Sequence, residues 1–350
     1  MKKKIILIIF LLIFFVGAAF AAYFYKMFFT NNIALEAGKS QLIFLPTGGN
    51  INNLYDSLEK YEVLENMSSF KMLSNYKNLE KRYKSGCYKI EGKMSNNALV
   101  NMFASGRQQP IKIVFNNIKT KEDLAKRVGT KLECGEKALL DVLKNDSIIQ
   151  EYGFTKDNFM SVFIPNTYEV YWNMPAEQFV EKMFNEWKSF WTVKRLQKAK
   201  DIGLSPIEIT ILSSIVFAET KKADEMSTVA GVYINRLKKG WKLQADPTVI
   251  YGIGDFSITR VRKKHLEFDS PYNTYIYEGL PPGPINLLEP YVIDHVLNYK
   301  KHNYMFFCAK EDFSGYHNFA ETGAQHSANA AKYQKALSAW ERKKRLEKQK

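Results

Sequence analysis

The sequence predicts an α+β protein with three parts: an N-terminal transmembrane helix, a small α+β domain and a larger mixed α/β domain that carries the chemistry. An uncharged apolar run opens the chain, short apolar strands then alternate with amphipathic helices, and polar, proline-rich segments gather late in the sequence. A chain of 350 residues can bury two separate cores. We expect an anchor with its cytoplasmic stub at 1–30, a small domain at 41–110, the larger domain at 111–340 and a basic tail at 341–350.

The N-terminus has the features of a membrane anchor. Three lysines at positions 2 to 4 precede an uncharged run from Ile5 to Tyr25, which Lys26 closes. This length suits one helix across a hydrocarbon core of roughly 30 Å, and the lysines should stay in the cytoplasm. The alternative is a cleaved signal peptide, because the small residues between Gly17 and Ala22 resemble a cleavage site. The apolar run continues past that site, which favours a single-pass protein of the cell (inner) membrane with its larger part outside the cytoplasm.

Charge and cysteine content narrow the classes of partner. The formal net charge of +14 favours an anionic partner, which could be nucleic acid, acidic lipid or a carboxylate-bearing wall polymer. Export across the membrane argues against nucleic acid. Cys87, Cys134 and Cys308 lack the spacing of a metal site, so we interpret them as core or free thiols, of which one pair could be oxidised.

The small domain should alternate short strands and helices. A turn at 46–50 separates its first strand from an amphipathic helix. The expected elements are a strand at Leu42–Leu45, a helix through Leu54, Leu58 and Tyr61, a second helix, a strand at Gly86–Ile90 and a short helix at Asn97–Phe103 ending near Gly106. No acids, bases or nucleophiles converge here, which is typical of a binding or spacer module.

The first half of the larger domain should begin with a strand at Ile111–Phe115 and a helix at 121–131. Pro165 should start a loop rich in polar and aromatic groups, Thr167 among them. A long amphipathic helix should follow Pro175 and continue toward Ala199. At the other end of the chain, helical spacing continues beyond Trp340. The basic residues there indicate a solvated helix end or, alternatively, an anion-binding tail: Arg342, Lys343, Lys344, Arg345, Lys348 and Lys350.

A helix that begins after Ser205 carries the main candidate for catalysis. Ser205 and Glu208 form a capping-box pattern with proline at the first helical position. Glu219 falls on the same face as the apolar stripe that contains Leu212 and Val216. A carboxyl group against apolar side chains has a raised pKa, as a general acid needs near neutral pH. The alternative is a structural Glu219 paired with Lys221 or Lys222.

The next helix is expected at Asp224–Lys238, with Gly240 as its stop. Its apolar stripe, which includes Tyr233, is interpreted as core. Asn235 and Arg236 near its end either cap neighbouring backbone or line a cleft.

Three polar, proline-containing loops are expected at 244–252, 270–275 and 279–285. Amides, hydroxyls and tyrosine rings held by prolines lose little entropy on binding, and they suit a ligand with hydroxyl groups and apolar faces, such as a sugar. Any one of these segments taken alone would favour an ordinary proline turn.

With these segments in place, the chain resembles the endolytic murein transglycosylases of the MltG, or YceG-like, family over most of its exported part. The matching segments are Ser-Ile-Val-x-x-Glu-Thr at 214–220, Ala-Gly-Val-Tyr-Ile-Asn-Arg-Leu at 230–237, Gln-x-Asp-Pro-Thr-Val-x-Tyr-Gly at 244–252, Ser-Pro-Tyr-Asn-Thr-Tyr at 270–275 and Gly-Leu-Pro-Pro-Gly-Pro-Ile at 279–285. The resemblance implies a LysM-like small domain at 41–110 and a catalytic role for Glu219. Two departures stand out: Phe217 replaces a second Glu of many relatives, and their late His-Asn pair is His326-Ser327 here.

The resemblance implies a lytic transglycosylase that cuts between MurNAc and GlcNAc with a single acid/base, ends nascent glycan strands beside the peptidoglycan synthases and needs no cofactor. We expect a common set of residues to bind and orient the glycan: Gln244, Asp246, Tyr251, Ser270, Tyr272 and Asn273, with Asn235, Thr167 and His326 as further candidates. His326 could equally be a hydrogen-bonded structural histidine. A muramidase with Asp246 or Asp269 as its second carboxylate, and a non-catalytic tether between wall and membrane, remain alternatives.

Overall fold

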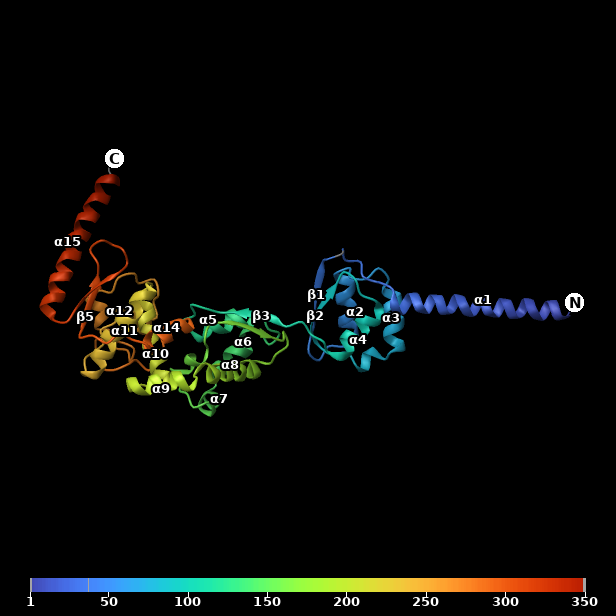
Figure 1. The fold of residues 1–350 in the computed structure, drawn as a ribbon, viewed down its shortest axis with the longest axis horizontal. Helices are drawn as coiled ribbons and strands as arrows, with labels where there is room; N and C mark the ends of the chain where they lie inside the picture. Colours follow the sequence, from blue (N-terminus) through green and yellow to red (C-terminus); the bar gives the residue numbers. More distant parts are fainter. Residues whose placement is uncertain (1, 37, 349–350) are drawn as a thin grey trace. The chain divides into compact units, whose positions relative to one another are not determined.

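The computed structural model describes residues 2–36 and 38–348, and within them it is mixed α+β, mostly helical, with three two-stranded sheets (Figure 1). The chain divides into two compact units. The first contains Met1–Ile113, Thr130–Gly135 and Tyr168–Pro175, and the second contains Val114–Gly129, Glu136–Thr167 and Ala176–Lys350.

Helix α1, Lys2–Phe29, is the N-terminal apolar helix that the sequence predicts. Its segment Lys3–Phe29 contains an 18-residue window with a mean hydropathy of 3.1 and is long and apolar enough to cross a membrane. Its end is tied to the first unit, since Met27 is buried and its carbonyl accepts a hydrogen bond of 3.1 Å from the Asn96 amide.

The strands and helices predicted for residues 42–106 are confirmed. Strand β1, Ser40–Leu45, pairs antiparallel with β2, Gly86–Glu91. Three helices complete the unit, α2 at Ile51–Lys60, α3 at Met67–Tyr76 and α4 at Asn96–Ser105, together with a 3₁₀ turn at Leu79–Lys81. Apolar side chains of the sheet and helices share one core, in which Ile43, Leu54, Phe70, Tyr88 and Phe103 are almost fully buried.

The next segment begins with β3, Ile111–Val114, which pairs with β4, Thr167–Val170. Between them lie α5 at Lys121–Gly129, α6 at Gly135–Lys144, α7 at Asp146–Glu151 and a 3₁₀ turn at Phe159–Val162. Thr167 therefore belongs to a strand, whereas we expected a loop after Pro165. The alternation explains this, because Tyr168 and Val170 point to the buried side and Thr167 to solvent.

The single long helix expected after Pro175 was wrong, because two helices occupy this stretch: α8 at Ala176–Phe190 and α9 at Val193–Ile202. The chain breaks at Thr192, which adopts an extended conformation and caps α9 by accepting a hydrogen bond of 3.4 Å from the Arg195 amide. The apolar pattern continues across the break, so the sequence analysis missed Thr192 as the N-cap that starts α9.

The second unit is built around three helices that pack together: α10 at Pro206–Glu219, α11 at Ala223–Lys238 and α14 at Pro290–Leu297 (Figure 1). Both expected helix starts and the stop at Gly240 are confirmed, and the Ser205–Glu208 capping box is formed. Aliphatic side chains of the three helices make the core of the unit, including Leu212, Val229 and Val296.

The remaining elements are α12 at Asp246–Ile253, α13 at Lys263–Leu266, the antiparallel pair β5 at Phe306–Ala309 and β6 at His317–Ala320, and α15 at Gly323–Lys348. Helix α12 corrects our expectation of an irregular loop at 244–252, because Pro247 lies in its first turn, where a missing N–H costs nothing. Helix α15 confirms the helical pattern beyond Trp340, and Lys350 lies outside the described residues.

Candidate active site

Glu219 is the last residue of α10. The side chain is partly buried behind the apolar stripe of its own helix. Burial raises the pKa of this carboxyl to about 7, and the negative charge of Asp246 adds to the rise. The Tyr233 hydrogen bond and the positive charge of Arg236 act in the opposite direction. A carboxyl with this pKa carries its proton part of the time at neutral pH, which suits a general acid.

Tyr233 holds one oxygen of this carboxyl in place. Its hydroxyl donates a hydrogen bond of 2.7 Å to Oε1 of Glu219, and the tyrosine is almost completely buried on α11. Burial and the neighbouring Glu219 raise the pKa of Tyr233 well above its usual value, so the hydroxyl stays protonated and remains a donor. The hydrogen bond leaves Oε2 as the oxygen that can carry a transferable proton.

Within the described residues, neither Lys221 nor Lys222 forms an ion pair with Glu219, so that alternative was wrong. Lys221 instead donates a hydrogen bond of 3.1 Å to the Phe217 carbonyl and lies 3.8 Å above the Phe217 ring. The Lys222 ammonium lies 4.6 Å above the ring of Tyr316. Phe217 thus serves as an apolar platform for Lys221.

Ser214 joins the end of α10 to the proline-rich segment at 279–285. Its hydroxyl accepts a hydrogen bond of 3.0 Å from the Ile285 amide, and its carbonyl accepts one of 3.2 Å from the Asn286 side chain. All three residues are buried. The serine in Ser-Ile-Val-x-x-Glu-Thr therefore positions a neighbouring segment one turn before Glu219.

The segments at 244–252 and 270–275 meet at Thr274. Its carbonyl accepts from the Gln244 amide at 3.0 Å, and its hydroxyl accepts from the Ala245 amide at 3.0 Å. The hydroxyls of Thr248 and Thr274 lie 2.8 Å apart in the buried interior. These contacts fix the start of α12, which carries Asp246.

Two tyrosines from the same segments lie beside them. The ring centroids of Tyr251 and Tyr272 are 4.7 Å apart with the rings tilted by 50°, and burial raises the pKa of both. The Tyr251 hydroxyl donates a hydrogen bond of 3.4 Å to the Lys119 carbonyl. Gly252 and Gly283 make the close approach of the segments possible: a Cβ at Gly252 would lie 2.7 Å from the Ser270 hydroxyl, and one at Gly283 would lie 2.9 Å from the Tyr272 hydroxyl. The three motif segments are thus brought together, as a common site requires.

Asp246 is the second carboxylate near the acid. It is exposed, it accepts a hydrogen bond of 2.7 Å from the Tyr275 hydroxyl, and its charge acts on Glu219. Asp269 is also exposed and accepts a hydrogen bond of 2.7 Å from Tyr277. Of the two, Asp246 is the one coupled to Glu219.

Several predicted binding residues are engaged inside the protein. Asn273 is 1% exposed, and its side chain donates to the carbonyls of Leu266 and Phe268. Ser270 is buried as well. Gln244 is exposed and holds a left-handed φ of 51° at the turn into α12. Thr167 is exposed on β4 and is not among the residues that these contacts bring together.

Asn235 and Arg236 both donate hydrogen bonds to neighbouring backbone, and Asn235 also lines a pocket. Asn235 donates to the carbonyls of His302 and Tyr304 at 2.8 and 3.0 Å. Arg236 is buried and donates to the carbonyls of Leu243 and Met305, with a bond of 2.8 Å to the latter. Its charge also reaches Glu219. The pair therefore fastens the irregular segment before β5 to the helix that carries Tyr233.

His326 stacks on Phe306, with ring centroids 5.3 Å apart. Its Nδ1 is buried without a hydrogen-bond partner in the described part of the chain. Burial, together with the charge of Arg236, lowers the pKa of the imidazole. We considered a hydrogen-bonded structural histidine at this position, but Nδ1 of His326 has no such partner among the described residues. The lowered pKa keeps the imidazole ring neutral.

Tyr233 and Tyr275 are the site residues that the sequence analysis did not assign to the site. Tyr233 was assigned to the core by its spacing, which was correct for its ring. A buried tyrosine hydroxyl needs a polar partner, so the one hydroxyl within an aliphatic stripe was a usable signal. That partner, a carboxyl from the preceding helix, cannot be read from periodicity.

The chain is similar to bacterial proteins of known name. The chain is 28% identical over 310 residues to a Bacillus subtilis (strain 168) protein named endolytic murein transglycosylase, covering 83% of this chain and 84% of that one. A protein of the same name from Streptococcus pneumoniae (serotype 2, strain D39) is 23% identical over 320 residues, and the match covers 83% of this chain but only 57% of the relative.

Among solved structures, a YceG-like protein from Listeria monocytogenes matches with a TM-score of 0.53 and 26% identity, over 83% of this chain and 99% of that one. The model of the YceG-like family matches residues 43–332, which include every motif segment described above. Since this match spans most of the sequence, the chain belongs to the YceG-like family.

Proposed function

We propose that the protein is an endolytic lytic transglycosylase that cleaves the β-1,4 bond between MurNAc and GlcNAc in peptidoglycan strands. The single observation that carries this proposal is Glu219, a carboxyl whose pKa burial raises to about 7 and whose Oε1 is fixed by Tyr233. The names of the relatives from Bacillus subtilis and Streptococcus pneumoniae support the same substrate and reaction class.

In the first step the protonated Glu219 gives its proton to the glycosidic oxygen. Because Tyr233 donates to Oε1, the proton leaves from Oε2, and the hydrogen bond stabilises the carboxylate that forms. The C–O bond then breaks, and the GlcNAc-bearing half departs as an alcohol.

In the second step the carboxylate of Glu219 accepts a proton from the 6-hydroxyl of MurNAc. That oxygen closes on the anomeric carbon of the same sugar and gives a 1,6-anhydro ring. The nucleophile belongs to the substrate, so the reaction needs neither a second catalytic carboxylate nor a cofactor. Glu219 ends the cycle protonated, as it began.

We further propose that the motif segments bind and orient the glycan. The exposed or partly buried members supply contacts with the sugar: Gln244, Asp246, Tyr251 and Tyr272. Ser270, Asn273 and Asn235 act by holding the loops in shape. The Ser270 hydroxyl accepts a hydrogen bond of 3.3 Å from the Tyr272 amide, and the side chains of Asn273 and Asn235 donate to backbone carbonyls. Thr167 and His326 remain predictions, with His326 as a neutral ring beside Arg236.

The proposal has a second part, which concerns the first unit and helix α1. We infer that residues 41–110 form a LysM-like wall-binding domain and that α1 anchors the chain in the cell membrane, so that cleavage occurs on nascent strands near the synthases. This placement suits an enzyme that ends strand elongation.

The experiment is mass spectrometry of fragments after the exported part is incubated with uncrosslinked glycan strands. Ends that carry 1,6-anhydroMurNAc, lost in Glu219→Gln, are the expected result. No release of fragments, with sedimentation on peptidoglycan retained, would instead leave a tether.

A muramidase is the second candidate, because the charge of Asp246 reaches Glu219. This reaction would use water as nucleophile and leave reducing ends. Asp246→Asn should then abolish cleavage, whereas Asp269→Asn, whose carboxylate is held by Tyr277 on the surface, serves as the matched control.

A further inference from the structure

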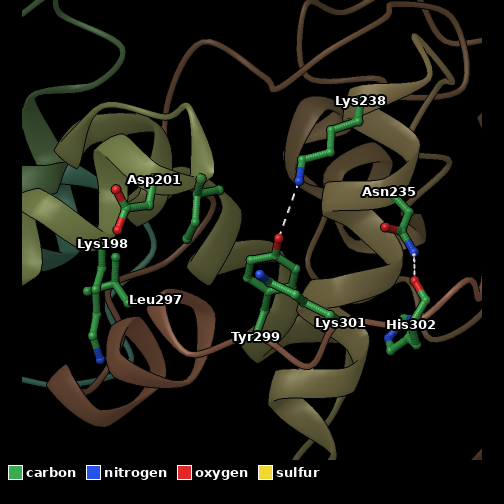
Figure 2. A pocket seen from close by; sticks show the side chains of 9 residues that line it. Lys198, Asp201, Asn235, Lys238, Leu297, Tyr299, Lys301 and His302 are labelled. Carbon is green, nitrogen blue, oxygen red and sulfur yellow. Dashed lines mark hydrogen bonds between the residues drawn. The ribbon is translucent and has the colours of Figure 1, made fainter.

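The second unit contains a pocket of about 530 Å³ that is separate from the proposed catalytic site (Figure 2). Its lining comes from the last turns of α9 and α11, the end of α14 and the segment that follows α14. On α11, the lining residue Asn235 stands two positions after Tyr233. Two positions turn a helix by about 200°, so the pocket and Glu219 lie on opposite sides of α11.

Three lysines line this pocket: Lys198, Lys238 and Lys301. We call it the lysine pocket. The Lys238 ammonium donates a hydrogen bond of 3.3 Å to the Tyr299 hydroxyl, and Lys198 donates to the Asn298 side chain. Within residues 2–36 and 38–348, none of the three ammonium groups forms an ion pair with a carboxylate. A ligand can therefore supply their counter-charge.

Compensation of helix ends explains only part of this charge. The C-terminus of a helix carries about half a negative elementary charge, and lysines in a last turn are favourable there. Lys238 occupies such a position on α11, whereas Lys198 precedes the last turn of α9. Lys301 lies in the segment between α14 and β5, outside any helix, so the dipole gives no reason for it.

The pocket also offers groups of other kinds. Asp201 is exposed on its edge and accepts a hydrogen bond of 2.8 Å from Gln197, and Ile202, Leu297 and the Tyr299 ring provide apolar surface. A carboxylate on the edge and three nearby helix C-termini disfavour a compact dianion such as phosphate. They suit a ligand that combines carboxylates, an amine and short apolar side chains.

We propose that the lysine pocket binds the peptide stems carried by the glycan strands. This inference rests on the proposed function, because it assigns a second recognition site to the same substrate. Stem carboxylates meet Lys238, Lys301 and the Tyr299 hydroxyl, the stem amine lies toward Asp201, and alanine methyl groups contact Ile202 and Leu297. The enzyme would thereby recognise strands whose stems are still uncleaved.

The test measures binding of a synthetic stem pentapeptide by calorimetry, with the full-length Glu219→Gln protein in detergent. Lys238→Met combined with Lys301→Met should weaken the Kd by about tenfold or more, the loss expected for charge-assisted hydrogen bonds. Lys238→Arg with Lys301→Arg keeps the charges and should stay within about threefold. Lys194→Met and Lys200→Met remove exposed lysines of α9 outside the pocket and should leave the Kd unchanged.

Three results would overturn the proposal: equal binding by the double methionine protein, equal binding of a pentapeptide with amidated carboxylates, or displacement of the peptide by equimolar inorganic phosphate. The arginine variant separates loss of charge from loss of structure. Peptide binding is measured on the Glu219→Gln protein, so it does not depend on catalysis. If the stem proposal fails, the peptide does not bind as described. If the proposed reaction fails, 1,6-anhydro ends are missing while peptide binding remains.

Discussion

The buried carboxyl of Glu219 links catalysis to stability. A group whose folded-state pKa is about 7, against 4.5 for the free side chain, holds its proton more tightly when folded. Between these two values the folded protein binds more protons than the unfolded chain, so the free energy of unfolding falls as pH rises from 4.5 to 7. Above pH 7, Glu219 is ionised in both states, and the full free-energy cost of burying its charge lowers the stability of the folded protein.

Glu219→Gln should therefore stabilise the protein in alkaline solution. The amide stays neutral and can still accept the Tyr233 hydrogen bond, so we expect a gain of about 2 kcal/mol at pH 8, after a reduction for the partial exposure of the side chain. Near pH 4.5 the gain should vanish. Urea unfolding at the two pH values measures it; an equal effect at both would show that the pKa of Glu219 is not raised.

The pH dependence of cleavage should report the same carboxyl. Only protonated Glu219 starts the reaction, so kcat/KM should fall tenfold per pH unit above about 7. Tyr233→Phe removes a hydrogen bond that lowers this pKa, so its alkaline limb should move to higher pH while kcat drops about tenfold. Tyr277→Phe, at a surface tyrosine bonded to Asp269, is the matched control. An unshifted limb in Tyr233→Phe would assign that limb to another group.

At the residue scale, the sequence was sufficient to predict the apolar surroundings of Glu219 but not its hydrogen-bond partner. Helical spacing alone places Glu219 on the apolar face of its helix, because the spacing of apolar residues can be read directly from the sequence. The donation from Tyr233 to Glu219, 14 residues apart, depends on how α10 and α11 pack. The internal roles of Asn273 and Ser270 depend in the same way on loop conformation.

At the scale of elements, two motif glycines set how closely the loops approach one another. A Cβ at Gly283 would lie 1.9 Å from the Asp157 carbonyl oxygen, which belongs to backbone and cannot rotate away. At Gly252 the obstacle is the hydroxyl of Ser270, at 2.7 Å. Glycine is required at these positions because of contact, since neither has the positive φ of a turn glycine.

Gly283→Ala should consequently destabilise the second unit by about 2 kcal/mol or more, the cost of forcing extra volume into packed structure. It should also displace Tyr272, whose hydroxyl lies 2.9 Å from the added Cβ, and reduce activity. Gly323→Ala is the control, because nothing lies within 4 Å of its Cβ at the start of α15. Thermal unfolding compares them, and equal Tm values for both variants would contradict the prediction.

Elements with strong local signals were predicted well, and those that depend on context were not. Helix α10 has a capping box and proline at its start, and its bounds follow from them. The break between α8 and α9 depends on one threonine within a continuous apolar pattern. Helix α12 was taken for a loop because Gln244 to Gly252 are polar and contain proline, although proline also starts helices.

At the scale of the whole molecule, each of the two units has its own buried core. The first unit contains α1 and the β1–β2 sheet, and the second contains Glu219 and every motif segment. The alternation of strands and helices was enough to predict an α+β chain. The entry of residues 130–135 and 168–175 into the first unit could not be foreseen, because it depends on contacts between segments far apart in sequence.

The final prediction concerns the fate of α1 in cells. An 18-residue window of mean hydropathy 3.1 without buried residues has the composition of a span, but a signal sequence meets the same criterion. We expect α1 to be retained, because the uncharged apolar run continues past the candidate cleavage point at Ala22 to Tyr25. The contact between Met27 and Asn96 lies after that point and would be present in either case.

Membrane fractionation with intact-mass measurement decides between the two outcomes. The full chain should sediment with membranes at its uncleaved mass, resist extraction by high salt and be released by detergent, whereas a chain lacking residues 1–29 should be soluble. Glu219→Gln should fractionate like the wild type, since its change is far along the sequence. A mature mass that begins near residue 23, with the protein in the soluble fraction, would show that the helix is a signal peptide. The proposed enzyme would then reach the wall without an anchor of its own.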